Sequence, residues 1–328
     1  MTQGNAAVDY SRLVRNQVVN QIHEPVSKYI LDSVPEDLSF DDFTSYIKNA
    51  LQKDFPEANI EITETIKNND LCLSGLVIRE DQINISPQIY LNDFYSMYQN
   101  GTSLTEIYQR VWQMYVNSRK RQSIDLSFFT DFPKVKDHII FDLISQKKNK
   151  RLLEDVPYIP YLDLAIVFRC LLDCDDQGRS SILIRKDHMN HWQITKDELL
   201  KLAKNNTPTL LPAHIQPMVE LLESMLPEEE LDDDALPMYI LSNQTHLNGA
   251  ASILYQNVLK DFAEKQGKDL FILPSSIHEV LLVPVIPDAD REELDRMVQE
   301  VNATEVSQDE ILSDHAYYYS RKMNAVSY

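Results

Sequence analysis

Residues 270–284 (LFILPSSIHEVLLVP) consist of two short apolar runs on either side of a turn. Pro274, Ser275 and Ser276 separate the two runs, and residues of these types form turns. The stretch therefore predicts two neighbouring strands joined by a tight connection.

The segments on both sides of this stretch complete a repeating pattern. Residues 238–241 and 316–319 are apolar enough for strands, and residues 249–266 and 290–302 carry apolar side chains at helical spacing. We expect residues 236–328 to form one strand-helix-strand-strand-helix-strand domain. Both helices should pack on its sheet, because the short connections leave their apolar stripes no other partner.

The rest of the chain mixes helices and strands in the same way. Strands are predicted at 60–66, 71–78, 83–91, 162–172 and 180–185, and helices at 40–55, 103–118, 195–204 and 212–226, with one helix or two, interrupted near Pro25, at 8–31. Ser39 is predicted to cap the helix at 40–55, and Thr195 with Glu198 to form a capping box at the start of 195–204. Residues 135–144 fit a helix and a strand equally well. The predicted class is α+β, with antiparallel sheets and helices packed on them.

Four segments follow from this pattern. Residues 1–154 are expected to form an N-terminal α+β domain, and residues 155–226 a middle segment that packs with the C-terminal part. The acidic residues 227–235 are expected to be a linker or loop, since prolines lie at both ends. Residues 236–328 form the C-terminal domain.

The charge is negative overall and positive in one region. Net charge is −20, yet between Arg110 and Arg151 ten Lys or Arg stand against four Asp. This basic island fits a solvated face, a contact with an acidic protein surface, or a contact with nucleic acid. Its candidate binding residues are Lys120, Arg121, Lys147, Lys148 and Arg151. An acidic protein is favoured over nucleic acid, because the remaining charge of the chain would repel a phosphate backbone.

Glycine is scarce, with six residues and no two closer than eighteen positions. Phosphate-binding loops need glycines a few residues apart, so that backbone N–H groups can approach the anion. The spacing excludes a Walker loop, a dinucleotide fingerprint and the Gly-x-Ser-x-Gly elbow of α/β-hydrolases. We expect no cofactor.

One cysteine and histidine arrangement is similar to a zinc site. Cys170 and Cys174 precede His188 and His191 by a gap near that of a zinc finger. However, Cys170 lies in an apolar strand and the histidine pair is tighter than usual. Core thiols and surface imidazoles are the simpler interpretation, and we expect no bound metal.

A hydrolytic site is a second hypothesis. Ser276, His278 and Glu279 offer a hydroxyl, a base and an acid within one turn. A nucleophile needs its base within hydrogen-bond reach, and alternate residues of a strand point to opposite faces. Ser276 would reach His278 only if the turn folds it back. Asp314 and His315 would add a second pair if the closing strand lies next to this one. A polar turn that satisfies backbone groups is the alternative.

Five motifs together resemble one bacterial family. They are Leu162–Phe168 (LDLAIVF), His188–Thr195 (HMNHWQIT), Leu273–Val280 (LPSSIHEV), Glu300–Asn302 (EVN) and Leu312–Tyr317 (LSDHAY). The family is catalogued as domain of unknown function number 5688 and is found largely in gut Firmicutes; the number 1444 family is a looser likeness. The resemblance implies a cytoplasmic bacterial protein with an α/β core and carries over no catalytic residue.

Composition agrees with a cytoplasmic location. The three cysteines are an odd number, no apolar run approaches the length of a membrane span, and the amino terminus lacks the pattern of a signal peptide. The functional hypothesis is a non-enzymatic adaptor or regulatory protein that acts through protein contacts and does not bind membranes. A hydrolase at residues 274–280 is the alternative, and a nucleic-acid-associated protein is a second one. Partner identity and oligomeric state do not follow from the sequence.

Overall fold

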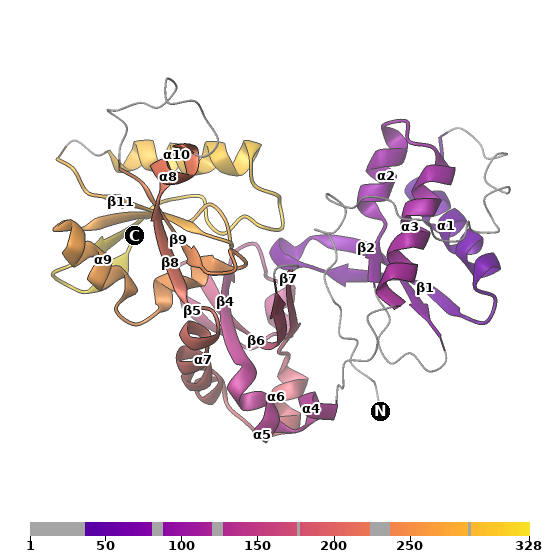
Figure 1. Ribbon diagram of the computed structural model, residues 1–328, viewed down its shortest axis with the longest axis horizontal. Helices are drawn as coiled ribbons and strands as arrows, with labels where there is room; N and C mark the ends of the chain where they lie inside the picture. The colour runs from indigo at the N-terminus through magenta and orange to yellow at the C-terminus, as the bar shows by residue number, and fades with distance from the viewer. Residues whose placement is uncertain (1–36, 81–87, 120–126, 176–177, 224–236, 288–289) are drawn as a thin grey trace. The chain divides into compact units, whose positions relative to one another are not determined.

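The computed structural model describes residues 37–80, 88–119, 127–175, 178–223, 237–287 and 290–328 (Figure 1). The chain forms two compact units, here called the N-terminal and C-terminal units. The first comprises residues 1–67 and 72–126, and the second comprises 68–71 and 127–328. Residues 127–154, which we expected in the N-terminal domain, therefore belong to the same unit as the rest of the C-terminal half. The expected helix at 8–31 and the acidic segment 227–235 lie outside the described residues.

Three helices and a three-stranded antiparallel sheet make up the described N-terminal unit. They are α1 (Phe40–Asp54), β1 (Asn59–Ile66), β2 (Cys72–Arg79), β3 (Gln88–Tyr90), α2 (Asn92–Gln99) and α3 (Leu104–Arg119). Ser39 caps α1, because its hydroxyl accepts a hydrogen bond from the Asp42 N–H. Phe43, Ile47 and Leu51 follow at helical spacing and are fully buried in the core of this unit.

The described part of the C-terminal unit contains two antiparallel sheets. Its strands are β4 (Ile139–Ser145), β5 (Tyr158–Tyr161), β6 (Leu164–Asp175), β7 (Gly178–Leu183), β8 (Ala213–Pro217), β9 (Tyr239–Asn243), β10 (Leu270–Leu273), β11 (Val280–Pro284), β12 (Tyr317–Ser320) and β13 (Ala325–Ser327). Its helices are α4 (Ser127–Thr130), α5 (Phe132–Val135), α6 (Lys186–Trp192), α7 (Lys196–Leu210), α8 (Met218–Glu223), α9 (Val258–Gln266) and α10 (Arg291–Thr304), with 3₁₀ turns η4 (Asn68–Asp70), η5 (Lys136–His138), η6 (Leu152–Glu154) and η8 (Gly249–Leu254).

The smaller sheet is organised around β6, as the apolar run at 162–172 predicted. β4 pairs with β6 on one side, and β5 and β7 pair with it on the other. Arg169 interrupts the apolar run of β6, and its Nε lies 2.8 Å from a carboxylate oxygen of the buried Asp142 on β4. The charged residue inside the central strand is thus paired with a neighbouring strand.

Helix α7 covers the outer edge of β4. The Thr207 hydroxyl accepts a hydrogen bond from the Phe141 N–H at 3.1 Å, and the Asn206 amide donates to the Ile139 carbonyl at 3.0 Å. These side chains occupy backbone groups that an edge strand would otherwise leave unpaired. α7 begins with the predicted capping box of Thr195 and Glu198.

The larger sheet has six strands in the order β13-β12-β10-β11-β9-β8. It contains the predicted strand-helix-strand-strand-helix-strand pattern, with β8 and β13 added at its two edges. α9 packs on one face through Leu259 and Phe262, and α10 packs on the opposite face through Leu294 and Val298 (Figure 1). The α+β class and the antiparallel sheets are confirmed.

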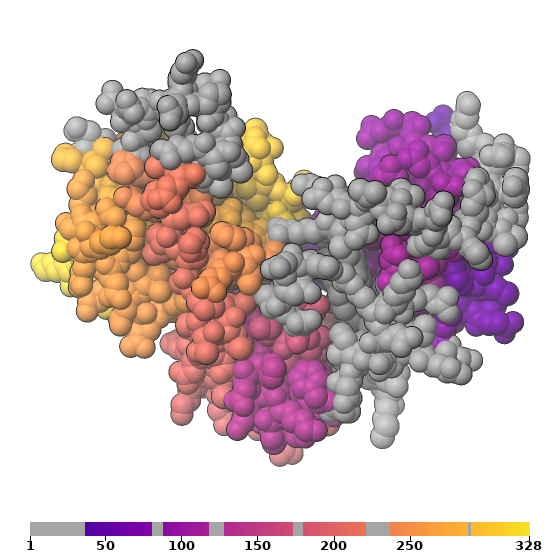
Figure 2. Space-filling model, viewed as in Figure 1, coloured from indigo at the N-terminus to yellow at the C-terminus, as the bar shows by residue number. Residues whose placement is uncertain are grey.

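Both sheets contribute to one hydrophobic core. Phe141 and Phe168 of the smaller sheet share a cluster with Leu241, Ile272 and Leu282 of the larger sheet. In the space-filling view, the described residues from 127 onward form one continuous body (Figure 2). The middle and C-terminal segments accordingly fold together.

Two helix predictions were wrong. Residues 212–226 contain strand β8 and the short helix α8 within the described part, because Ile215 pairs with Leu241 of β9 and packs in the shared core. The helix at 249–266 is divided into η8 and α9. Tyr255 is extended between them, with its hydroxyl bonded to the Leu211 carbonyl, and Asn257 has a left-handed φ of 65°. In the segment 135–144, whose type the sequence left open, residues 139–144 belong to strand β4.

Candidate functional site

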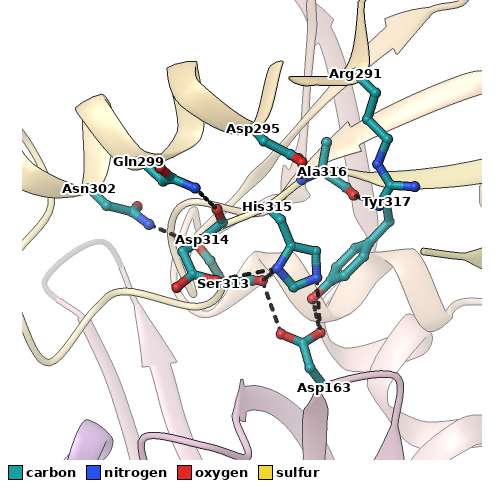
Figure 3. Close-up of polar contacts among 10 residues, drawn as sticks. All are labelled: Asp163, Arg291, Asp295, Gln299, Asn302, Ser313, Asp314, His315, Ala316 and Tyr317. Carbon is teal, nitrogen blue, oxygen red and sulfur yellow. Dashed lines mark hydrogen bonds and ion pairs between the residues drawn. The ribbon is translucent and has the colours of Figure 1, made fainter. Parts of the chain in front are cut away.

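Two motifs that are far apart in the sequence meet in the C-terminal unit. Ser313-Asp314-His315-Ala316 leads into β12, and Asp163 lies in the two-residue turn between β5 and β6 (Figure 3). Leu162 before it has a φ of 53°. A left-handed backbone is unfavourable for a branched side chain and often marks a functional position. The strained turn places the Asp163 carboxylate against the motif that precedes β12.

Both carboxylate oxygens of Asp163 accept a hydrogen bond from a hydroxyl. The Tyr317 hydroxyl donates to Oδ1 at 2.5 Å and the Ser313 hydroxyl donates to Oδ2 at 3.1 Å (Figure 3). Tyr317 is fully buried. Burial, together with the hydrogen bond to Asp163, raises the pKa of Tyr317, so the phenol keeps its proton at neutral pH. The carboxylate is thereby held in one orientation.

His315 completes the cluster between two aromatic rings. Its Nδ1 lies 3.3 Å from both the Ser313 hydroxyl and an Asp314 carboxylate oxygen, and its Nε2 lies 3.8 Å from Asp163 Oδ1. The Tyr328 ring stacks on the imidazole at 5.4 Å, and the Tyr317 ring meets it edge-on. We call Asp163, Ser313, His315 and Tyr317 the Asp163 cluster.

Helix α10 holds the backbone of this motif. Four side chains along one side of the helix bond to main-chain atoms of residues 313–316 (Figure 3). They are Arg291 to the Ala316 carbonyl, Asp295 from the Ala316 N–H, Gln299 to the Asp314 carbonyl and Asn302 to the Ser313 carbonyl, at 3.1, 2.6, 3.1 and 2.8 Å. Positions three to four residues apart share a helix face, so the spacing explains why all four reach the same segment.

A loop after β4 carries cations beside the Asp163 cluster. This basic loop (residues 146–151, QKKNKR) has Lys147, Lys150 and Arg151 exposed and Lys148 half-buried. No ion pair of these four cations is found within the residues that the structure describes. The Gln146 N–H donates to the Asp163 carbonyl, which joins the loop to the β5–β6 turn.

Buried amides fix the backbone of the basic loop. Asn149 is fully buried, and its side-chain amide donates to the Ser145 carbonyl and to Asn69 Oδ1. In return, the Asn69 N–H donates to Asn149 Oδ1 at 2.7 Å. The Asp70 carboxylate accepts from the N–H groups of Arg151 and Leu152, which are both held at about 3 Å. The backbone of the loop is therefore rigid, whereas its lysine side chains extend outward.

An open hollow of about 510 Å³ lies between the loop and the turn. Its lining residues are Gln146, Lys147, Lys150, Leu153, Glu154, Tyr158 and Asp163. Two lysines and two acidic residues therefore contribute to the lining of the same space. Leu153 is buried and Tyr158 is half-buried, so the hollow also has an apolar part.

The five binding residues predicted from the sequence divide into two groups. Lys147, Lys148 and Arg151 all lie on the basic loop. Lys120 and Arg121 lie outside the described residues, so their relation to the loop stays a prediction.

The residues of the hydrolase hypothesis lie elsewhere in the C-terminal unit. The Ser276 hydroxyl is buried and accepts from the His278 backbone N–H at 3.0 Å. His278 Nδ1 accepts from the Asn248 N–H, and its Nε2 lies 3.1 Å from Glu310. Glu279 is half-buried. The carboxylate beside His278 is thus Glu310, from a segment 32 residues away.

The residues of the zinc hypothesis have separate surroundings. Cys170 is buried in the shared core, where desolvation raises the pKa of its thiol to about 12. His188 Nδ1 accepts from the Arg185 N–H, and His191 Nε2 lies 3.3 Å from the Thr130 carbonyl. The side chain of Cys174 is not among those described. Within the described residues, no group of three or more His, Cys, Asp or Glu side chains is placed to hold a metal ion.

The Asp163 cluster was not predicted as a site. Asp163 stood out only as a polar residue in an apolar run. His315, with Asp314, was considered as a second pair for the hydrolase hypothesis, and Tyr317 was assigned to a family motif and a predicted strand. An acidic residue at the start of a buried strand is the signal that could have directed attention to it, since such residues are rarely buried without partners.

Fold and cluster together define the class as an α+β protein with a polar cluster between the two antiparallel sheets described in its C-terminal unit. The chain belongs to the family of unknown function DUF5688, whose model matches residues 40–321. No curated protein and no solved structure matches the chain. In the described part of the chain, every helix is too short or too polar to cross a bilayer.

Proposed function

We propose that this chain is a cytoplasmic, non-enzymatic adaptor or regulatory protein whose basic loop binds an acidic surface of a partner protein. The observation that carries the proposal is the set of four cations, Lys147, Lys148, Lys150 and Arg151, on a loop whose backbone is fixed by buried Asn149. A charged loop that served solubility alone would not need a buried backbone anchor.

A fixed backbone favours binding for an entropic reason. Ordering a flexible loop costs about 1–2 kcal/mol for each residue whose backbone becomes fixed. Here the contacts of Asn149, Asn69 and Asp70 already fix the backbone of the loop in the free protein. Binding then restricts only the lysine and arginine side chains.

The charge distribution favours a compact acidic partner over nucleic acid. The loop is a local positive patch on a chain of net charge −20. A nucleic acid strand would extend beyond the patch, and salt screens its repulsion from the acidic remainder only beyond about 8 Å. A protein surface of similar size to the loop meets no such repulsion.

Charge reversal tests the proposal. A variant with Lys147, Lys148, Lys150 and Arg151 changed to Glu serves as bait in lysate of the native cell, beside the unchanged protein. A matched control reverses three exposed lysines of α7, Lys196→Glu, Lys201→Glu and Lys204→Glu. Proteins retained by the unchanged chain and the control, but not by the loop variant, are then purified.

The decisive measurement is the association rate of a purified partner. We expect loop reversal to slow association by about tenfold or more at low salt, with a smaller effect as the salt concentration rises. Equal rates for the loop variant and the α7 control would refute the proposal. Micromolar binding of duplex DNA, single-stranded DNA or RNA that depends on the loop would replace the protein partner with nucleic acid.

A further inference from the structure

We infer that the hollow beside the basic loop binds a small zwitterion, with the carboxylate of the ligand at Lys147 and Lys150 and its ammonium group at Asp163 and Glu154. The chemical class is a free α-amino acid or a short peptide with charged ends. This site is additional to the partner surface proposed above, although the two share the basic loop.

The balance of charge in the lining determines the ligand class. Lys147, Lys150, Glu154 and Asp163, two residues of each sign, line one space of about 510 Å³. An anion alone would lie near Asp163 and Glu154 without compensation, and a cation alone would lie near Lys147 and Lys150 in the same way. An apolar molecule would desolvate four charged groups without forming an ion pair or a hydrogen bond with any of them. A ligand with one charge of each sign pairs with both sets.

The negative end of the hollow is positioned in advance. Asp163 accepts from the hydroxyls of Tyr317 and Ser313, which use one lone pair on each oxygen. A carboxylate has about four acceptor positions, so capacity for an ammonium group remains. The Asp163 side chain keeps 27% of its surface exposed, which makes that capacity accessible.

The positive end is positioned by the loop backbone. Lys147 and Lys150 flank Asn149, whose side chain is held by the Ser145 carbonyl and by Asn69. The two lysines therefore leave the same fixed turn. Ammonium groups on flexible stems can close on a carboxylate after it enters.

The apolar lining and the size of the hollow agree with this ligand class. Leu153 and Tyr158 supply apolar contact for the side chain or methylene groups of the ligand. Small-molecule sites measure about 300–1,000 Å³, so the hollow takes one amino acid or a short peptide.

Titration calorimetry of the full chain tests the inference directly. The probes are glycine, leucine, glutamate and the dipeptide alanylalanine, each beside its N-acetyl and amide derivatives. We expect saturable binding of at least one free compound. Both blocked forms should bind at least tenfold more weakly, because a hydrogen bond to a charged group accounts for about that factor. Single amino acids and the dipeptide distinguish the two sources of the ligand.

Three results would overturn the inference. They are the absence of saturable heat from every probe at millimolar concentration, equal affinity for free and blocked forms, and unchanged affinity in the variants described next.

Two exposed sites supply variants that test each end. Lys147→Ala with Lys150→Ala should weaken binding at the carboxylate end by at least tenfold, and Glu154→Gln should weaken it at the ammonium end. Lys196→Ala with Lys201→Ala on α7 is the matched control. The urea midpoint of each variant verifies its fold.

A further pair separates this site from the partner surface. Lys148 and Arg151 belong to the basic loop but do not line the hollow. Lys148→Glu with Arg151→Glu should slow partner association and leave the zwitterion affinity unchanged. Failure of one proposal is therefore visible without failure of the other.

Discussion

Asn69→Ala tests the most heavily bonded side chain next to the basic loop. Its amide nitrogen donates to the carbonyls of Gln308 and Ile311, each at 2.7 Å, and its Oδ1 accepts from the Asn149 amide at 3.0 Å. Asn69 also has a left-handed φ of 59°. The substitution removes three hydrogen bonds and leaves alanine in a backbone conformation that it adopts reluctantly.

The expected loss combines these two contributions. Each hydrogen bond contributes about 0.5–1.5 kcal/mol. The contact with Gln308 is exposed and lies at the lower end, so the three together amount to about 2–3 kcal/mol. A left-handed alanine adds about 1 kcal/mol. We expect the free energy of unfolding of the C-terminal unit to fall by about 3–4 kcal/mol in total.

Urea unfolding measures this loss, and a second variant separates its parts. Tryptophan fluorescence suits the measurement because Trp192 is buried in the core of the C-terminal unit. Asn69→Gly loses the same hydrogen bonds but accepts a positive φ, so it should be about 1 kcal/mol more stable than Asn69→Ala. A loss below about 1 kcal/mol in both variants would refute the assignment of these hydrogen bonds as the anchor of the loop.

Three further predictions follow from individual side chains. Tyr317→Phe removes the short hydrogen bond to Asp163 and should lower the free energy of unfolding by about 1.5–3 kcal/mol in urea titration; an unchanged midpoint would contradict it. Because burial raises the pKa of Cys170 to about 12, its thiol should resist iodoacetamide at pH 8 in the folded chain, whereas the exposed Cys72 reacts; mass spectrometry of the peptides distinguishes the two. Burial lowers the pKa of His188, so below its ordinary pKa the unfolded chain binds more protons and stability falls as the pH drops. His188→Gln should reduce the slope of stability against pH between about pH 7 and pH 5, and an equal slope would contradict this assignment.

Local sequence pattern was sufficient to predict a helix or strand whose packing depends on one of its faces. Ser39 and Thr195 cap the helices that they were predicted to cap, and the two apolar runs on either side of Pro274 form β10 and β11. These signals depend on neighbours within a few residues, so no long-range contact is needed to interpret them. Residues 212–226 show the limit of this reasoning. Their apolar residues were interpreted as one helix, but Ile215 pairs with Leu241 in the larger sheet, and this long-range pairing makes residues 213–217 a strand.

The candidate site could not be predicted from local sequence pattern. Asp163 and Tyr317 are 154 residues apart, and Asn69 and Asn149 are 80 apart. No periodicity in the sequence connects such positions, because their contact depends on how the two sheets share a core.

Local sequence pattern was enough to predict the α+β class, the strand and helix order of residues 236–328 and the cations of the basic loop. The contacts between distant segments placed Lys147, Lys150 and Asp163 in the lining of one hollow and buried the Asn149 side chain that fixes the loop. The physical reason is that charge and apolar periodicity are properties of the chain, whereas a binding site is a set of distances that exists only after the core has packed.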